Sequence, residues 1–174
     1  MGVLFETVHL RVRMFESSDA EQLYRNHSED AMRKWIPNEY YADIAEAEDA
    51  IRFYRNCTEN RCLPYVLAVE SKENGELIGD AGVNEVDGQP LEVEIGYSIA
   101  ENYGGRGYAT ELVGAMTDFA AKSFGIRVLY GRVLHGNGAS VRVLEKNGYR
   151  FVAEETGAED DPYGNGMRIY KKQL

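Results

Sequence analysis

Glu101-Asn-Tyr-Gly-Gly-Arg-Gly-Tyr-Ala-Thr-Glu111 is the most informative stretch of this sequence, because the residues on its two sides have different periodicities. In the preceding Leu91–Ile99, apolar and polar residues alternate, which predicts a strand with one buried face. In the following residues 109–120, apolar side chains recur at helical spacing, and Gly125 marks the end of that helix. The glycines therefore lie at a turn that joins a strand to the N-terminus of a helix.

This turn has the chemistry of an anion-binding site. Gly104, Gly105 and Gly107 have no Cβ, so an anion can approach their backbone N–H groups closely. The unpaired N–H groups at the start of a helix and the positive end of its dipole favour phosphate, and Arg106 adds a cation. The spacing matches neither the Rossmann fingerprint nor the P-loop, and an ordinary glycine-rich turn is the alternative. The pattern predicts a site for a ligand that carries a diphosphate.

Length and composition indicate one globular domain that spans residues 1–174. Of the 174 residues, 44% are apolar and 28% are charged, which is usual for a soluble domain with a substantial core. No segment is long and apolar enough to cross a membrane, and Met1–Phe15 lacks the apolar region of a signal peptide. We therefore expect a cytoplasmic protein with no membrane partner. Cys57 and Cys62 fit neither a zinc nor a disulfide pattern, so we expect reduced thiols and no metal.

The charge balance is acidic, with a formal net charge of -10 at pH 7. Binding to nucleic acid needs a basic face, so we expect no nucleic-acid partner. An acidic surface usually confers solubility, and it would also attract a cationic substrate. The sequence leaves the oligomeric state open, a homodimer included.

The remaining patterns predict a mixed α/β chain whose strands are mostly antiparallel. A strand at Thr7–Met14 precedes a helix that is opened by a capping box, Ser18-x-x-Glu21. Lys72–Gly75 is typical of a hairpin turn, so the strands around it and Leu91–Ile99 form a meander. The other predicted elements are a helix at 28–35, a loop at 38–43, a helix from residue 44, strands at 63–69, 76–86, 126–134, 149–155 and 167–171, and a helix at 139–146.

A second motif follows the predicted strand at 126–134. In Asn137-Gly-Ala-Ser140-Val-Arg-Val-Leu-Glu-Lys-Asn-Gly148-Tyr149, Asn137 can cap a helix and Ser140 lies in its first turn. Together with Glu94-Ile-Gly-Tyr97 and Gly105–Glu111, this motif resembles the GNAT superfamily of acyl-CoA-dependent N-acyltransferases, and most closely its ribosomal-protein N-terminal acetyltransferases of RimJ/RimL type. The likeness covers nearly the whole chain, although residues 1–61 match only in their pattern of elements. Gly104 departs from the broader superfamily, which has Gln or Arg at the leading position of the turn.

The resemblance implies the GNAT fold, a mixed and mostly antiparallel sheet with splayed central strands flanked by helices. It also implies acetyl-CoA as the acyl donor, with its diphosphate on the glycine turn and its peptide-like pantetheine arm along the preceding strand. A free backbone N–H near Ser98–Ile99 would then stabilise the oxyanion of the tetrahedral intermediate. The residues implied to bind acetyl-CoA are Tyr97, Ser98, Ile99, Gly104, Gly105, Arg106, Gly107, Tyr108, Ala109, Thr110 and Asn137.

Glu94 and Ser140 are the candidates for proton transfer. Glu94 lies on the polar face of the central strand near the expected thioester, so we expect it to accept the amine proton through water, with Glu92 in reserve. A solvated or ion-paired carboxylate is the alternative for each. Ser140 matches the family position proposed for protonation of the leaving thiolate, and helix capping is its alternative role.

These inferences predict an N-acetyltransferase whose acceptor is a primary amine, and the likeness to the RimJ/RimL group favours a protein or peptide N-terminus. A small cationic amine, such as a polyamine or an aminoglycoside, and a non-catalytic acyl-CoA-binding module are the alternatives. A tight acidic pocket would favour the small amine, and an open groove the peptide. We expect His135 to be structural or to line the substrate site. We expect the acidic loop Glu154–Asp161 to be a solvated connection, with attraction of the amine as its alternative role. The remaining candidates are Trp35, Tyr40 and Tyr41 as core or rim of the acceptor pocket, and Arg142 and Lys146 near the CoA phosphates or on a helix surface.

Overall fold

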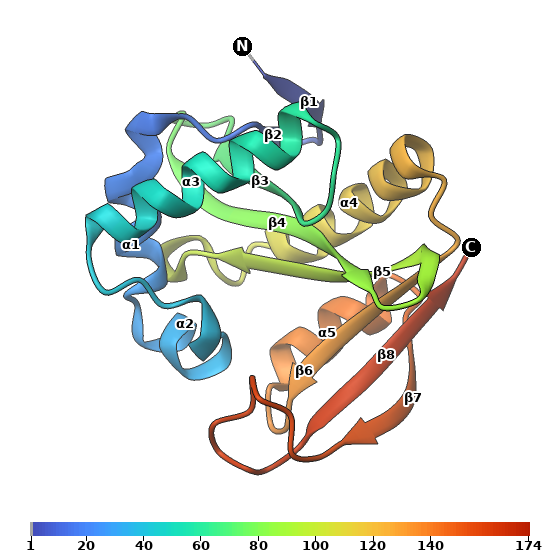
Figure 1. Ribbon diagram of the computed structural model, residues 1–174. Coiled ribbons are helices and arrows are strands. Elements are labelled where there is room, and N and C mark those ends of the chain that lie inside the picture. The colour runs from blue at the N-terminus through green and yellow to red at the C-terminus, as the bar shows by residue number, and fades with distance from the viewer. Residues whose placement is uncertain (1) are drawn as a thin grey trace.

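A computed structural model describes residues 2–174 as one eight-stranded sheet with helices on both faces (Figure 1). The strand order is β1-β2-β3-β4-β5-β6-β8-β7, and all neighbours are antiparallel except β5 and β6. The strands are β1 Val3–Glu6, β2 Leu10–Arg13, β3 Tyr65–Ser71, β4 Leu77–Val86, β5 Gln89–Ile99, β6 Val128–Leu134, β7 Arg150–Glu155 and β8 Met167–Gln173. The helices are α1 Ala20–His27, α2 Asp30–Trp35, α3 Ile44–Glu59, α4 Tyr108–Phe124 and α5 Gly138–Lys146. None of the helices in the described residues is long and apolar enough to cross a membrane.

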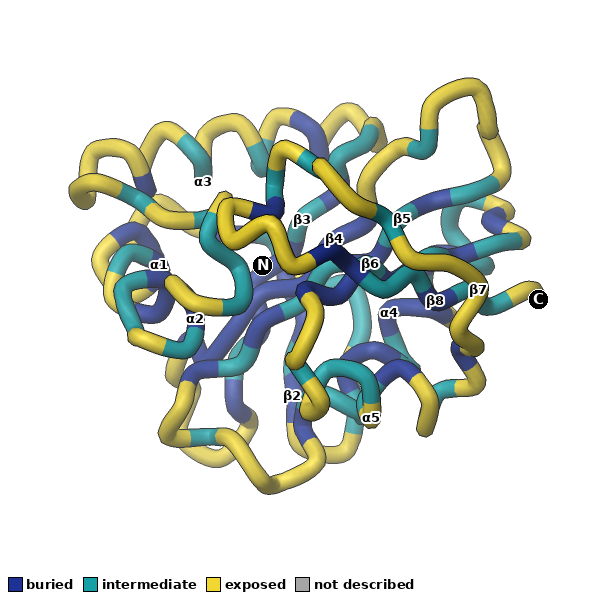
Figure 2. Tube along the Cα trace, turned by 90° about the horizontal axis from the view of Figure 1, so that it is seen from below, coloured by how far each residue is buried: buried dark blue, intermediate teal, exposed yellow. Residues whose placement is uncertain are grey.

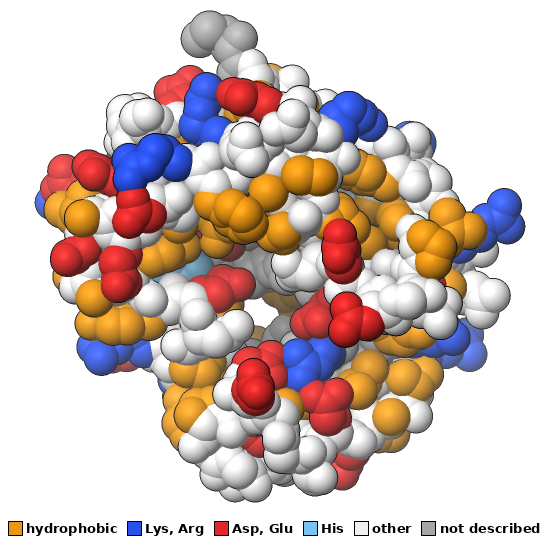
Figure 3. Space-filling view, in the orientation of Figure 1, with side chains coloured by type: hydrophobic (Ala, Val, Ile, Leu, Met, Phe, Trp, Pro, Cys, Tyr) orange, Lys and Arg blue, Asp and Glu red, His pale blue; other side chains and the backbone are white. Residues whose placement is uncertain are grey.

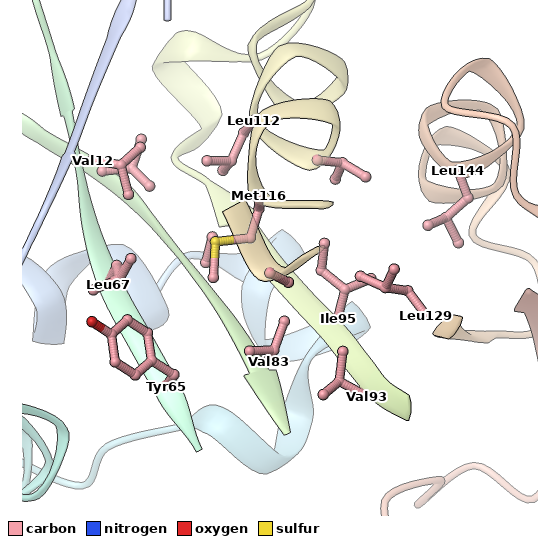
Figure 4. Packing of buried hydrophobic residues seen from close by; sticks show 14 of the residues in the cluster. Val12, Tyr65, Leu67, Val83, Val93, Ile95, Leu112, Met116, Leu129 and Leu144 are labelled. Atoms are coloured by element: carbon pink, nitrogen blue, oxygen red, sulfur yellow. The ribbon is translucent and has the colours of Figure 1, made fainter. Parts of the chain in front are cut away.

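Helices cover both faces of the sheet because the central strands are apolar on both sides. On β3, Leu67 packs in the larger buried cluster together with Met116 of α4 (Figure 4). The next residue, Ala68, faces the opposite side and packs in a second cluster with Ile51 of α3. Successive side chains of a strand point to opposite faces, so each face needs its own helical cover. Figure 2 shows the result as buried strands between helices whose outer sides are exposed.

The two central strands separate partway along their length, as the family resemblance implies. β5 and β6 are paired only from Glu92 to Glu94, which lie opposite Val128 to Tyr130. Beyond Glu94, β5 continues to Ile99 with β4 as its partner, and β6 continues with β8 as its partner. The second half of β5 therefore has one edge that no strand of the described chain occupies.

Two local predictions were wrong. The single strand predicted at Thr7–Met14 is the turn and second arm of a hairpin, because β1 already pairs with β2 and Thr7 N–H donates to the Leu10 carbonyl at 2.9 Å. The capping box forms at Glu16 and Asp19, where the Glu16 N–H donates to Asp19 Oδ2 at 2.7 Å, and not at Ser18 and Glu21. A separate 3-10 turn, Pro37–Glu39, follows α2 after Ile36 and overlaps the start of the predicted loop at 38–43.

Candidate active site

A cleft of about 560 Å³ opens where β5 and β6 separate. Its walls come from the second half of β5, the end of β6, the glycine turn with the start of α4, one side of α5, and α2. Both sequence motifs therefore meet at one cavity, in which residues as far apart in the sequence as Tyr97 and Ser140 lie together. Figure 3 shows a hollow in the middle of this side of the molecule, surrounded by acidic side chains.

The glycine turn presents free backbone N–H groups to this cleft. Gly105 and Gly107 have φ angles of 75° and 80°, which glycine adopts readily, and Gly107 is the N-cap of α4. The Gly104 N–H donates to the Glu101 carbonyl at 3.0 Å, and the Glu111 N–H donates to the Gly107 carbonyl. Between these two, the N–H groups of 105–110 have no backbone acceptor in the described residues. The cradle of free amides therefore starts at Gly105, and Gly104 contributes only to its wall.

Side chains around the turn hold it in place. The Glu111 carboxylate accepts from the His9 N–H and lies 2.8 Å from His9 Nδ1, so the first turn of α4 is tied to the β1–β2 turn. The Tyr108 side chain is buried, which leaves its backbone for a ligand. Arg106 is exposed and does not line the cleft, and its guanidinium lies 3.7 Å from the Glu73 carboxylate.

The free edge of β5 also carries unpaired N–H groups. The Ala100 N–H donates to the Ile78 carbonyl of β4 at 2.7 Å. Because N–H groups alternate between the two edges of a strand, those of Tyr97 and Ile99 point toward the gap next to β6. Ser98 faces the other way and is buried, and its hydroxyl has no hydrogen-bond partner in residues 2–174.

Tyr97 and Ser140 connect the two motifs directly. The Tyr97 hydroxyl and Ser140 Oγ are 2.5 Å apart, across the cleft from β5 to α5. Burial raises the pKa of Tyr97 to about 12, so the phenol is neutral and can donate. Asn137 Oδ1 accepts from the Ser140 N–H at 3.3 Å, which confirms that Asn137 caps α5.

Glu94 lies at the point where the strands separate, and its side chain is 31% exposed. Burial raises the pKa of the Glu94 carboxyl, and the Arg132 guanidinium, 3.7 Å away, opposes that shift. Glu92 accepts from the Tyr130 hydroxyl at 2.7 Å and does not line the cleft. The structure therefore places Glu94 at the cleft and leaves Glu92 outside it.

Arg132 on β6 was not among the sequence candidates. It donates two hydrogen bonds to Asp160, at 2.6 and 3.0 Å, and also pairs with Glu155. It thereby attaches the acidic loop to the cleft wall beside Glu94. An arginine on an alternating strand gives no sequence signal for this role, because its partners lie more than 20 residues away.

We expect Arg132→Met to lower the free energy of unfolding by about 2 kcal/mol at pH 7, because Glu94, Glu155 and Asp160 lose their shared cation. Hydrogen bonds from Arg132 lower the pKa of Asp160, so this contribution is present above the ordinary Asp pKa and is lost as the pH falls through the lowered one. Urea unfolding at pH 7 and in acid measures the difference. Arg25→Met, which removes an exposed pair with Glu21, should cost under about 0.5 kcal/mol. Equal losses for the two variants would contradict the role of Arg132.

The other sequence candidates divide between the cleft and the surface. Trp35, Arg142, Lys146 and Asp160 line the cleft. His135 is exposed and is not a lining residue, and Tyr40 is 45% exposed outside it. His135 therefore does not line the substrate site, which was one of the two roles expected for it.

Comparison with known proteins shows the family of this chain. The sequence model of the acetyltransferase (GNAT) domain matches residues 9–150. An uncharacterized N-acetyltransferase of Bacillus licheniformis, p20, is 28% identical over 139 residues, which cover 79% of this chain and 77% of the relative. The ribosomal-protein-S5-alanine acetyltransferase from Vibrio fischeri has a TM-score of 0.84 at 19% identity, covering 97% of this chain and 95% of that chain. RimL, a ribosomal L7/L12 alpha-N-protein acetyltransferase solved in complex with coenzyme A, has a TM-score of 0.83 at 16% identity, covering 99% and 98%.

The chain belongs to the GNAT acetyltransferase family and is an N-acetyltransferase. The two structural likenesses establish the fold, and the predicted resemblance to this family is confirmed. The family uses acetyl-CoA, and RimL is one neighbour with coenzyme A bound.

Proposed function

We propose that this protein transfers the acetyl group of acetyl-CoA to a primary amine, and that the acceptor is a protein or peptide N-terminus. The observation that carries the proposal is the row of free backbone N–H groups at 105–110, which opens into the same cleft as Glu94. Free amides at a helix N-terminus suit a diphosphate, and the cleft has room for a long ligand that extends to Glu94.

The free edge of β5 supports this placement of the donor. Pantetheine contains amides and can pair with a strand edge, as an added strand would. The N–H groups of Tyr97 and Ile99 point into the gap, so one can pair with the arm while the other faces the thioester oxygen. Asn137 lines the opposite side of the cleft.

In the proposed reaction the amine nitrogen attacks the thioester carbonyl carbon, the carbon–sulfur bond breaks, and the products are an amide and the thiol of CoA. Glu94 takes the proton that the amine loses, directly or through one water. Ser140, hydrogen-bonded to the neutral Tyr97 phenol, supplies a proton to the departing sulfur.

Two observations bear on the acceptor. The structural neighbours include enzymes named for ribosomal proteins S5 and L7/L12, and the cleft is open to solvent, as a peptide terminus requires. A small cationic amine is the second candidate, because Glu39, Glu94 and Asp160 make the acceptor end of the cleft acidic.

Release of CoA thiol from acetyl-CoA, measured across N-terminal peptides, polyamines and aminoglycosides, tests the proposal. We expect turnover above hydrolysis for at least one N-terminal peptide, with mass spectrometry placing the acetyl group on the α-amine. Tight acetyl-CoA binding with background rates for every amine would instead indicate an acyl-CoA-binding module.

We expect Ser140→Ala to lower kcat about tenfold and to leave the KM for acetyl-CoA unchanged. The effect is small for an acid catalyst because a thiol with a pKa of about 8.5 can leave without a proton, and the deficit should shrink above that pH. The variant keeps the backbone N–H that Asn137 caps, so α5 should stay intact. A kcat equal to that of wild type at pH 7 would show that Ser140 is not the acid and has only a structural role in α5.

A further inference from the structure

A second cavity, of about 250 Å³, adjoins the acceptor end of the cleft. Glu39, Asn84 and Gly96 line both cavities. In the β4–β5 register Asn84 lies opposite Glu94 and Asp80 opposite Ser98, so one face of the sheet continues from Glu94 into the second cavity. A Cβ at Gly96 would meet no atom within 4 Å, so the junction between the two cavities is open at this glycine.

The second cavity contains two carboxylates, Asp80 and Glu39, and one cationic side chain, His27. His27 Nε2 and Asp80 Oδ2 are 2.6 Å apart in a buried pair. Burial alone would lower the pKa of His27, but the Asp80 carboxylate outweighs it and raises that pKa to about 9, so His27 is protonated at pH 7 and pairs with Asp80. Glu39 lies within 4.8 Å of both partners and forms no salt bridge in residues 2–174.

Two polar groups in this cavity have no partner within the described chain. Burial raises the pKa of Glu39 to about 7, as expected for a carboxylate with no counter-ion. The His27 side chain is 1% exposed, and its Nδ1 has no hydrogen-bond partner in residues 2–174. Glu39 is half-buried and would accept hydrogen bonds from a cation, whereas the buried N–H of protonated His27 needs an acceptor atom elsewhere on the ligand.

The remaining walls suit an organic cation better than a metal ion. Tyr41, Phe53, Tyr54, Pro64 and Val66 line the cavity. Apolar and aromatic walls accommodate a methylene chain, and aromatic faces attract an ammonium or guanidinium group. The volume is several times the roughly 30 Å³ that one water occupies in the liquid, far more than an ion needs. A metal would also have to separate His27 from Asp80.

We propose that the second cavity binds a cationic group that the acceptor carries in addition to the amine that is acetylated. This inference rests on the proposed function and narrows its substrate class. The group is a primary ammonium or a guanidinium on a short apolar chain, with Glu39 as its counter-ion, while the reacting amine lies near Glu94. A peptide with Lys or Arg next to its N-terminal residue and a small polyamine both have this chemistry.

Paired acceptors that differ only in the second charge test the inference by turnover. The probes are a peptide with Lys as its second residue against the same peptide with norleucine there, and butane-1,4-diamine against butylamine. We expect wild-type kcat/KM to favour the charged member of a pair about tenfold, and Glu39→Gln to abolish that preference with the KM for acetyl-CoA unchanged. Glu48→Gln, which removes an exposed carboxylate of α3, should keep the preference. A difference in the peptide pair only, or in the amine pair only, identifies the source of the cation.

Calorimetric titration of the CoA-bound enzyme with the two amines gives a readout that needs no turnover. We expect the diamine to bind more tightly than the monoamine to wild type and to Glu48→Gln, and no more tightly to Glu39→Gln. Preferential binding without acetyl transfer to any amine would refute the proposed function and leave the cation site standing. Equal affinities for diamine and monoamine together with equal turnover of the paired peptides would overturn the inference, as would Zn²⁺ bound at His27 in place of the diamine.

Discussion

Gly105→Val should weaken acetyl-CoA binding about 100-fold. Gly105 has a φ of 75°, which a β-branched residue rarely adopts, so the turn must rearrange and its free amides lose their common direction. Hydrogen bonds to a charged group contribute about 1.5–3 kcal/mol each, and about 2.7 kcal/mol corresponds to the expected factor. Equilibrium dialysis or calorimetry with acetyl-CoA measures the change.

Gly88→Val provides the matched control. Gly88 has a φ of 74° and open space around its Cβ position, but it lies in the β4–β5 turn and not in the cleft. Both variants should lose similar stability, about 1–3 kcal/mol, and only Gly105→Val should lose the donor. If Gly105→Val bound acetyl-CoA within threefold of the control, the diphosphate would have to lie elsewhere.

Glu94→Gln should lower kcat/KM about 100-fold, because positioned general bases contribute roughly 10²–10⁴-fold. The glutamine keeps the size of the side chain and its place where β5 and β6 part, but it cannot take a proton. Glu92→Gln is the matched control on the same strand, because Glu92 is hydrogen-bonded to Tyr130 outside the cleft. Its kcat/KM should stay close to that of wild type.

The pH dependence of kcat/KM for wild type and for Glu94→Gln distinguishes a general base from a residue that only binds the acceptor. Burial raises the pKa of Glu94, and a base must be deprotonated, so wild-type activity falls as the pH drops through that raised pKa. Below it, the logarithm of kcat/KM should fall by two per pH unit, once for Glu94 and once for the acceptor amine. Glu94→Gln should show a slope of one throughout, and a slope of two in that variant would assign the second proton to another group.

The sequence predicted those elements whose formation depends on residues close together in the chain. Alternation predicts β5, and helical spacing after Tyr108 predicts α4, because each pattern reflects contacts of one continuous face. The β1–β2 turn could not be predicted in the same way. It contains no glycine, proline or asparagine, and Glu111 ties it down from about 100 residues away. The parting of β5 and β6 followed only from the family resemblance, because a pairing of three residues has no local signature.

In the candidate site, too, features set by local sequence could be predicted and those set by distant residues could not. The capping of α5 by Asn137 lies within one motif and was correctly inferred. The free amides of 105–110 were expected, but the bond from Gly104 to Glu101 depends on a local 3-10 turn that the sequence did not reveal. Arg132 and the neighbourhood of Glu39 bring together residues from separate helices, strands and loops. In the sequence alone, these charged residues cannot be distinguished from ordinary surface residues.

The alternation of β5 has a consequence for the order of events in the proposed reaction. Tyr97 points toward α5, whereas Gly96 opens into the cavities that Glu39 lines on the other side of the strand. In the proposed reaction the donor therefore lies on the α5 side of β5 and the acceptor on the Glu39 side, and the two meet in the gap where β6 separates from β5. Both reactants can be present together, so the acetyl group can pass from one to the other without first resting on the enzyme.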